Sequence, residues 1–288
     1  MSDAPPNAEQ VRNWNEVSGP TWVRMQAQLD AQLAQAGRLM LAALGPRPGE
    51  RALDVGCGCG ATSLALAEAV GPTGRVVGVD ISREMLARAG ERAAAAGLPT
   101  VTFVEADAQE HAFPPASFDV VASRFGVMFF DAPAKAFRAL GAALVPGGRL
   151  AFVCWQAVER NPIMSLASRA AAAVIAMPPR PAARAPGPFA FAEPDNVAEV
   201  LGDAGFVDVS VTPWEGTMLA GGTTDLDAAT EFALRVGPVA GALRQAGSDA
   251  EPAVRDAVKR ALAARWTADG AHLEASLWIV TARRPETA

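Results

Sequence analysis

The sequence has 288 residues, half of them hydrophobic, and a formal net charge of −6 with a pI of about 5.1. No run of lysine or arginine offsets this acidity, which argues against a nucleic acid as the main partner, because phosphate backbones are bound by cationic side chains. The first residues lack the apolar run of a signal peptide, no stretch has the length of a membrane helix, and the three cysteines form no disulfide framework. We therefore expect one elaborated domain in a soluble, cytoplasmic protein.

Apolar residues at helical spacing predict an N-terminal helical segment over residues 21–44, which the Gly- and Pro-containing sequence 45–49 ends. Beyond it, short apolar runs alternate with helical patterns. Strands are expected near 52–55, 76–79, 101–104, 120–122 and 150–155, and helices near 61–70, 83–96 and 134–144. This alternation predicts an α/β fold with a doubly wound parallel sheet.

Residues 53–60 read LDVGCGCG, so that an apolar strand ends in Asp54 and then turns through Gly56, Gly58 and Gly60. Alternating glycines let the backbone adopt conformations closed to other residues and come within contact distance of a ligand. The following helix points its free amide groups at the same place. The pattern predicts a nucleotide-binding turn.

Acidic residues follow the next two expected strands as well. Asp80 stands about 20 residues after the turn, where α/β nucleotide sites place a carboxylate against ribose hydroxyls, and Asp107 follows the strand near 101–104. The carboxyl ends of parallel strands form the crevice in which such sheets bind ligands. We expect Asp54, Asp80 and Asp107 to converge there.

The glycine turn also allows two other interpretations. Gly56, Gly58 and Ala61 also fit G-x-G-x-x-A, which leaves a nicotinamide-dependent oxidoreductase as an alternative. A carboxylate at Asp54 would oppose a pyrophosphate and favours a cationic ligand such as an ammonium or sulfonium group. Cys57 and the cysteine two residues on have no histidine near them, and zinc takes four ligands at wider spacings, so no metal site is expected.

Together these motifs resemble the class I S-adenosylmethionine-dependent methyltransferases, in particular the bacterial branch similar to the ubiquinone/menaquinone-biosynthesis methyltransferases. The matching segments, which lie within residues 45–155, are 53–60, 77–80, 105–108, 118–125 and 144–150. The resemblance implies a Rossmann-like seven-stranded sheet whose last strand is antiparallel. It also implies S-adenosylmethionine as the cofactor and S-adenosylhomocysteine as the product.

The resemblance assigns cofactor binding to residues at or just after the strand ends. They are Asp54, Gly56, Cys57, Gly58, Gly60, Asp80, Ile81, Met85, Asp107, Ala108 and Arg124. Asp54 and the glycine turn would hold the methionine end, Asp80 the ribose, and Asp107 the adenine amino group. Arg124 would hold either the cofactor carboxylate or an acidic acceptor.

A set of large apolar side chains is expected to line the acceptor cavity. It comprises Trp14, Trp22, Phe125, Met128, Phe129 and Trp155. Methyl transfer from a sulfonium depends mainly on alignment and the exclusion of water. The chain has no tyrosine and two histidines, of which His111 is the candidate base, although a surface or packing role is expected for it. We predict methylation of oxygen or carbon in a small apolar or aromatic molecule, with a non-methylating S-adenosylmethionine-binding enzyme as the alternative and homodimerisation left open.

Segments outside the central motifs are expected to form a cap or lid over the strand ends. The division is 1–44 as an N-terminal helical cap, 45–155 as the cofactor-binding core, 156–193 as a lid insertion, 194–212 as core, 213–271 as a helical lid insertion and 272–288 as the final core strand. Within these segments we expect a helix over 161–177, a mobile proline-rich linker over 178–188, and strands over 205–211 and 272–282.

Overall fold

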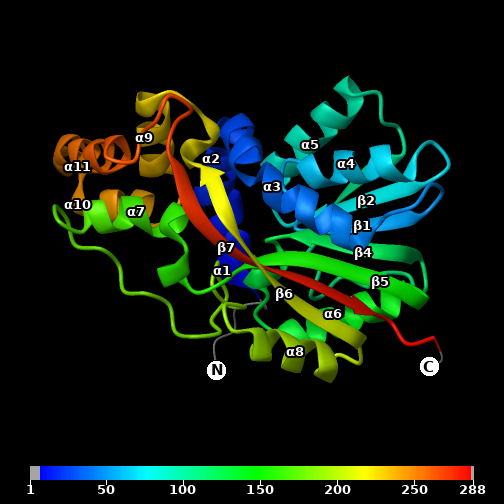
Figure 1. Ribbon diagram of the computed structural model, residues 1–288. Helices are drawn as coiled ribbons and strands as arrows, with labels where there is room; N and C mark the ends of the chain where they lie inside the picture. The colour runs from blue at the N-terminus through cyan, green and yellow to red at the C-terminus, as the bar shows by residue number, and fades with distance from the viewer. Residues whose placement is uncertain (1–6, 287–288) are drawn as a thin grey trace.

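The computed structural model describes residues 7–286. Within them, one seven-stranded sheet runs in the order β3-β2-β1-β4-β5-β7-β6 (Figure 1). The strands are β1 (Arg51–Val55), β2 (Arg75–Asp80), β3 (Val101–Glu105), β4 (Phe118–Arg124), β5 (Leu144–Trp155), β6 (Val207–Leu219) and β7 (His272–Arg283). The first five strands pair in parallel, whereas β7 lies antiparallel to both β5 and β6. The predicted seven-stranded sheet with an antiparallel last strand is confirmed.

Helices cover both faces of the sheet: α3, α4 and α5 lie on one face, and α6 and α8 lie on the other (Figure 1). Those on or between the strands of the first five-stranded region are α3 (Gln26–Leu44), α4 (Ala61–Val70), α5 (Arg83–Ala95), η2 (Val127–Phe129) and α6 (Pro133–Ala143). The later elements are η3 (Val158–Arg160), α7 (Pro162–Ala171), α8 (Pro194–Asp203), η4 (Ala220–Gly222), α9 (Leu226–Arg235), α10 (Pro238–Ala246), η5 (Ser248–Ala250) and α11 (Glu251–Ala263). Strands covered on both faces bury nearly every side chain, which is why β1 and β2 appear in the sequence as continuous apolar runs.

The N-terminal helical region differs from the single segment expected over 21–44. It begins with α1 (Ala8–Arg12), a π-helix η1 (Asn13–Val17) and α2 (Ser18–Arg24), and Met25 leaves the helical conformation before α3 starts. None of the residues of α1 and η1 is fully buried. Apolar residues at helical spacing indicate a helix with one buried face. Because α1 and η1 have no such face, this pattern does not predict them.

Strand β6 extends to Leu219, eight residues beyond the expected strand 205–211. Its last five residues pair with 272–276 of β7, past the point where β5 ends at the Trp155–Leu277 pair. Residues 213–219, which the sequence assigned to the helical insertion, therefore belong to the sheet. Pro213 and Gly216 weaken a strand prediction, but an edge strand tolerates both.

Helix α7 ends at Ala171, six residues before the predicted end at residue 177. Ile175 and Met177 follow it outside the helix and still pack against buried side chains of the helices α9 to α11. The alanine-rich sequence favours a helix locally, but this packing holds the chain in turns. The linker over 178–188 has no regular element, as predicted, whereas its mobility stays a prediction.

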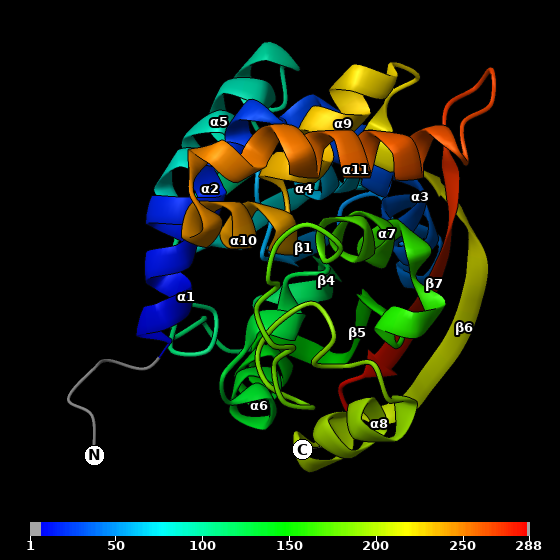
Figure 2. The same ribbon diagram turned by 90° about the vertical axis from the view of Figure 1, so that its left-hand side faces the viewer.

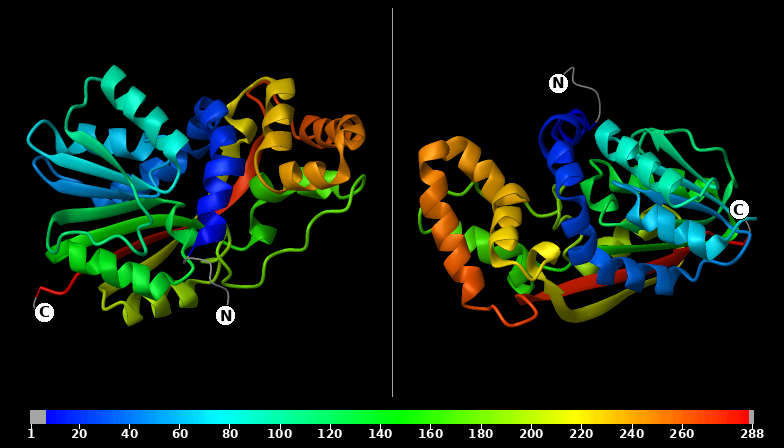
Figure 3. Two further views of the ribbon diagram at one scale, coloured as in Figure 1. Left: turned by 180° about the vertical axis from the view of Figure 1, so that it is seen from behind. Right: turned by 90° about the horizontal axis from the view of Figure 1, so that it is seen from above.

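Residues 7–286 form two hydrophobic cores. The larger surrounds the sheet, and the smaller lies among α7, α9, α10 and α11, where Leu234, Val239, Val254 and Val258 are buried. This helical unit lies to one side of the sheet, beyond the end of the β6–β7 ribbon (Figures 2 and 3). We refer to the two parts as the sheet unit and the helical unit.

No helix of the described residues combines the length and the apolar character needed to cross a membrane.

Candidate functional site

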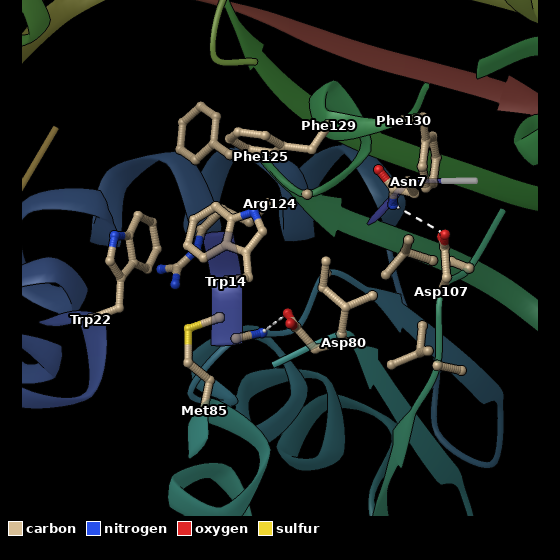
Figure 4. Close-up of a pocket in the computed structure, with 18 residues that line it drawn as sticks. Asn7, Trp14, Trp22, Asp80, Met85, Asp107, Arg124, Phe125, Phe129 and Phe130 are labelled. Atoms are coloured by element: carbon tan, nitrogen blue, oxygen red, sulfur yellow. Dashed lines mark hydrogen bonds between the residues drawn. The ribbon is translucent and has the colours of Figure 1, made fainter. Parts of the chain in front are cut away.

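A cavity of about 100 Å³ lies at the carboxyl ends of the parallel strands (Figure 4). Its lining comes from the loops after β1, β2, β3 and β4 and from the N-terminal helices. Asp80 and Asp107 mark one end of this cavity, and Trp22 with Arg124 marks the other. We call these the acidic end and the aromatic end.

The glycine turn forms one wall of the cavity through Gly56 and Gly58. Gly56, Gly58 and Gly60 have φ values of 67°, 54° and 82°, in the left-handed region that glycine adopts without strain. A Cβ at Gly56 would lie 2.6 Å from the Cα of Gly126, so no side chain fits there. The backbone can thus approach a ligand directly, as the sequence predicted.

Asp80 presents a buried carboxylate to the cavity. Its Oδ2 accepts a hydrogen bond from the Gly58 amide at 2.9 Å, and its Oδ1 accepts one from the Ser82 amide at 2.9 Å. Burial raises the pKa of Asp80, and these backbone donors oppose that rise because they stabilise the charged form. Each oxygen keeps a further lone pair with which to accept a ligand hydroxyl.

Asp107 lies at the same end of the cavity and is bound by residues that the sequence did not single out. Asn7 donates from Nδ2 to Asp107 Oδ2 at 3.1 Å, and the Gln109 amide donates to Oδ1 at 3.0 Å. Asn15 in η1 donates to the Ile81 carbonyl at 2.8 Å. These asparagines therefore hold the N-terminal segment against the strand ends. The sequence did not predict this role for them, because the segment is polar and has no apolar periodicity.

Asp54 does not line the cavity, contrary to the expectation that three carboxylates converge there. Its side chain is fully buried, and Ser63 of α4 donates to its Oδ2 at 2.6 Å. Its Oδ1 has no hydrogen-bond partner among the described residues, and burial raises the pKa of Asp54 to about 6. Successive side chains of a strand point to opposite faces, so Asp54 faces α4 while the next residue, Val55, contributes to the cavity lining.

The other predicted cofactor residues divide in the same way. Ile81, Met85, Ala108 and Arg124 line the cavity. Cys57 and Gly60 do not: Cys57 is buried behind the turn, and a Cβ at Gly60 would meet Ala89 of α5 at 2.9 Å. These two residues shape the turn from behind, and their assignment to cofactor binding stays a prediction.

Arg124 extends from the end of β4 into the aromatic end of the cavity. Its side chain is 14% exposed, and its nearest ion-pair partner is Asp30 of α3, with Nη2 and Oδ1 3.7 Å apart. Asp30 is bound more closely by Arg92, at 2.8 Å. Burial lowers the pKa of Arg124, although the guanidinium remains charged at any physiological pH.

Aromatic side chains line the same cavity as Arg124. Trp14 packs edge-to-face against both Trp22 and Phe129, with ring centroids 5.2 and 5.3 Å apart. Phe125 also lines the cavity and stacks on Trp155 at 4.6 Å. Trp155 and Met128 are buried and support this wall without lining the cavity, so their predicted contact with an acceptor receives no support from the geometry.

His111 does not line the cavity; it is half-buried and packs against Phe113 with ring centroids 4.6 Å apart. The titratable side chains that do line it, within residues 7–286, are Asp80, Asp107 and Arg124. None of the three is placed as a free general base, since both carboxylates already accept hydrogen bonds from neighbouring N–H groups. The arrangement is suited to binding and orientation.

Residues 52–148 match a family model described as a methyltransferase domain. The resemblance stated from the sequence is confirmed there, since the match spans the glycine turn, Asp80, Asp107 and Arg124.

Two named relatives and one solved structure extend this comparison. The nocamycin O-methyltransferase of Saccharothrix syringae is 40% identical over 60% of this chain and 64% of its own length. A demethylmenaquinone methyltransferase of Staphylococcus aureus is 34% identical over 51% of this chain and 61% of its own length. The chain thus spans somewhat less than two thirds of each relative. The crystal structure of Bacillus subtilis YcgJ matches 88% of this chain and 99% of its own with a TM-score of 0.59 at 18% identity, which supports the fold.

Proposed function

We propose that the protein is an S-adenosylmethionine-dependent methyltransferase that methylates oxygen or carbon of a small apolar or aromatic molecule. The observation that carries this proposal is the cavity, which brings together a glycine turn, two strand-end carboxylates and an aromatic wall. The turn and both carboxylates lie in the region that matches the methyltransferase model. The named relatives, an O-methyltransferase and a demethylmenaquinone methyltransferase, support a small-molecule acceptor.

The residues at the acidic end fit the cofactor. The backbone at Gly56 and Gly58 leaves room for close approach, Asp80 has lone pairs for two ribose hydroxyls, and Asp107 can accept from the adenine amino group. Met85, with its Sδ 3.9 Å from the place of a Cβ at Gly58, offers an apolar surface for the base. Bound S-adenosylmethionine supplies a methyl group already activated by its positive sulfur, so the protein has to align the acceptor and exclude water.

The cavity of about 100 Å³ is smaller than the roughly 300–1,000 Å³ of typical ligand sites. The N-terminal segment contributes Asn7, Trp14 and Trp22 to its lining, and hydrogen bonds from Asn7 and Asn15 hold this cover against the strand ends. For a nucleoside-sized ligand to enter, this cover has to move away and then close again. Such a closing cover would exclude water from the methyl group.

Calorimetric titration with S-adenosylhomocysteine tests the proposal, with NAD and NADP as comparisons. We expect binding of S-adenosylhomocysteine and no binding of the nicotinamide dinucleotides. Asp80→Asn keeps the shape of the side chain and removes its charge, and should weaken binding at least tenfold, because hydrogen bonds to a charged group contribute about 1.5–3 kcal/mol each. Asp203→Asn, at the end of α8 and away from the cavity, is the matched control.

Tight binding of a nicotinamide dinucleotide without any response to S-adenosylhomocysteine would establish the oxidoreductase alternative. Binding of S-adenosylmethionine without formation of S-adenosylhomocysteine, across a panel of phenols, enols and carboxylic acids, would establish the non-methylating alternative. It stays a prediction that the protein is cytoplasmic and that it does not bind nucleic acid. Whether it forms a homodimer stays open.

A further inference from the structure

Resting on the proposed function, we propose that the methyl acceptor is a planar molecule bearing an ionised oxygen acid, and that Arg124 binds its oxyanion. The shared chemistry is a delocalised oxyanion, such as a carboxylate, phenolate or enolate, attached to a flat ring system. The proposal assigns the aromatic end of the cavity to the acceptor and Arg124 to acceptor recognition.

The first observation is that the Arg124 side chain is buried but has unused donors. Within residues 7–286 it makes no hydrogen bond of 3.5 Å or less, and its contact with Asp30 is an ion pair at 3.7 Å. Arg92 at 2.8 Å and Gln26 at 2.6 Å both contact Oδ2 of Asp30, and its Oδ1 is the oxygen that faces Arg124. A guanidinium has five N–H donors in one plane, a geometry that matches the two oxygens of a carboxylate. Arg124 is therefore left able to bind an anion in the cavity.

The second observation is the shape of the surroundings. Trp14, Trp22 and Phe129 form a row of aromatic rings in contact with one another, and Figure 4 shows Arg124 lining the same part of the cavity as the two tryptophans. Flat apolar walls next to a planar cation fit a flat anion, because the ring packs on the aromatic side chains while the oxyanion meets the guanidinium. A flexible aliphatic acceptor would gain less from these walls, and a cationic acceptor would be repelled by Arg124.

The third observation concerns protons. Among the residues that the structure describes, the titratable ones that line the cavity are Arg124 and the two carboxylates Asp80 and Asp107 of the acidic end, both of which accept hydrogen bonds from the protein. An acceptor that arrives ionised has no proton to lose. Its oxygen lone pair forms the new bond to the methyl carbon, the electron pair of the broken carbon–sulfur bond stays on sulfur, and the oxyanion and sulfonium charges cancel. The site as built therefore suits an acceptor that is already an anion.

The competing role for Arg124 is to bind the carboxylate of the cofactor, and the experiment separates the two. 2-Naphthoate serves as the planar anion and 2-naphthamide as its neutral isostere, each titrated calorimetrically into protein saturated with S-adenosylhomocysteine. We expect 2-naphthoate to bind at least tenfold more tightly than 2-naphthamide to the unaltered protein. Arg124→Gln should abolish that preference, Arg124→Lys should retain part of it, and each should change the affinity for S-adenosylhomocysteine less than threefold.

Arg75→Gln is the control, because Arg75 is exposed at the opposite end of β2 from the cavity. Equal affinities of the unaltered protein for 2-naphthoate and 2-naphthamide would overturn the proposal. This comparison does not depend on whether any variant folds. A loss of S-adenosylhomocysteine affinity in Arg124→Gln of tenfold or more, with the naphthoate preference retained, would assign Arg124 to the cofactor instead. Failure of S-adenosylhomocysteine to bind the unaltered protein would reject the proposed function itself.

Discussion

The sheet unit and the helical unit both bury apolar side chains, but they differ in whether charged side chains are buried or exposed. The sheet unit buries the carboxylates of Asp54 and Asp80 at or near its strand ends, where one oxygen of Asp54 lacks a partner. In the helical unit the acidic and basic side chains stay at the surface. There Arg235 binds Glu231 at 2.6 Å and Glu251 at 2.7 Å, which ties α9 to α11.

This difference separates a binding site from a supporting structure. Burying a carboxylate costs free energy unless it is fully hydrogen-bonded, so such groups persist mainly where a ligand uses them. Partly exposed ion pairs such as those of Arg235 contribute little, typically about 0–1 kcal/mol. The helical unit is therefore held mainly by its own apolar core. The sheet unit loses some stability by burying Asp80 at the cavity and Asp54 behind it.

The largest expected effect is on the helical unit. Leu234 is fully buried in its core, so Leu234→Ala should lower the free energy of unfolding of this unit by about 2–5 kcal/mol through lost burial and a remaining cavity. Denaturant unfolding and hydrogen exchange measure this loss. Binding of S-adenosylhomocysteine should stay within threefold, and a much larger loss of binding would show that the two units are not separable in this way.

The next effect concerns the glycine turn. Gly56→Ala forces a Cβ to within 2.6 Å of the Gly126 Cα at a φ of 67°, so the turn has to shift. We expect at least a hundredfold weaker binding of S-adenosylhomocysteine, about 2.7 kcal/mol. Gly241→Ala in α10 is the control, because its Cβ would meet only the end of Arg244, at 3.7 Å; it should stabilise its helix by about 0.5–1 kcal/mol and leave binding unchanged.

Asp54 should make the sheet unit less stable as the pH rises. Its pKa in the folded protein is about 6, above the ordinary 3.8, so the folded state binds the proton more tightly than the unfolded chain. The stabilisation is complete below about pH 4 and is lost as the pH rises through about 6. Between pH 5 and pH 8 this loss amounts to about 1.4 kcal/mol for a folded pKa of about 6. Asp54→Asn should remove it, as measured by urea unfolding at the two pH values.

Asp119→Asn serves as the comparison for Asp54. Arg51 hydrogen-bonds to Asp119 and lowers its pKa below 3.8, so Asp119 contributes stability above that pH and loses it only as the pH falls further. Asp119→Asn should therefore leave the change in the free energy of unfolding between pH 5 and pH 8 as it is in the unaltered protein. If the free energy of unfolding of Asp54→Asn still fell between pH 5 and pH 8 as in the unaltered protein, Asp54 would not be the titrating group.

The smallest effect is expected for His111, which packs on Phe113 outside the cavity. His111→Ala should change single-turnover methylation less than threefold once an acceptor is known. General-base catalysis typically contributes a hundredfold or more. A loss of that size with both ligands still bound, rescued at high pH, would make His111 the base.

The sequence by itself determined the elements whose cause is local. The order of strands and helices in residues 45–155, the glycine turn and the strand-end positions of Asp80 and Asp107 all follow from short-range periodicity and backbone requirements, and the fold that they predict is confirmed. These features arise from contacts of each residue with its near neighbours in the chain. A single sequence records such contacts directly.

Only the tertiary structure decided which side chains face the cavity and what covers it. Asp54 turns toward Ser63 of α4, and Asn7 reaches Asp107 across a sequence separation of 100 residues. The extension of β6 depends on pairing with β7, which overrides the local effect of Pro213. Each of these outcomes depends on a partner distant in the sequence, and residue spacing within a segment carries no information about such a partner.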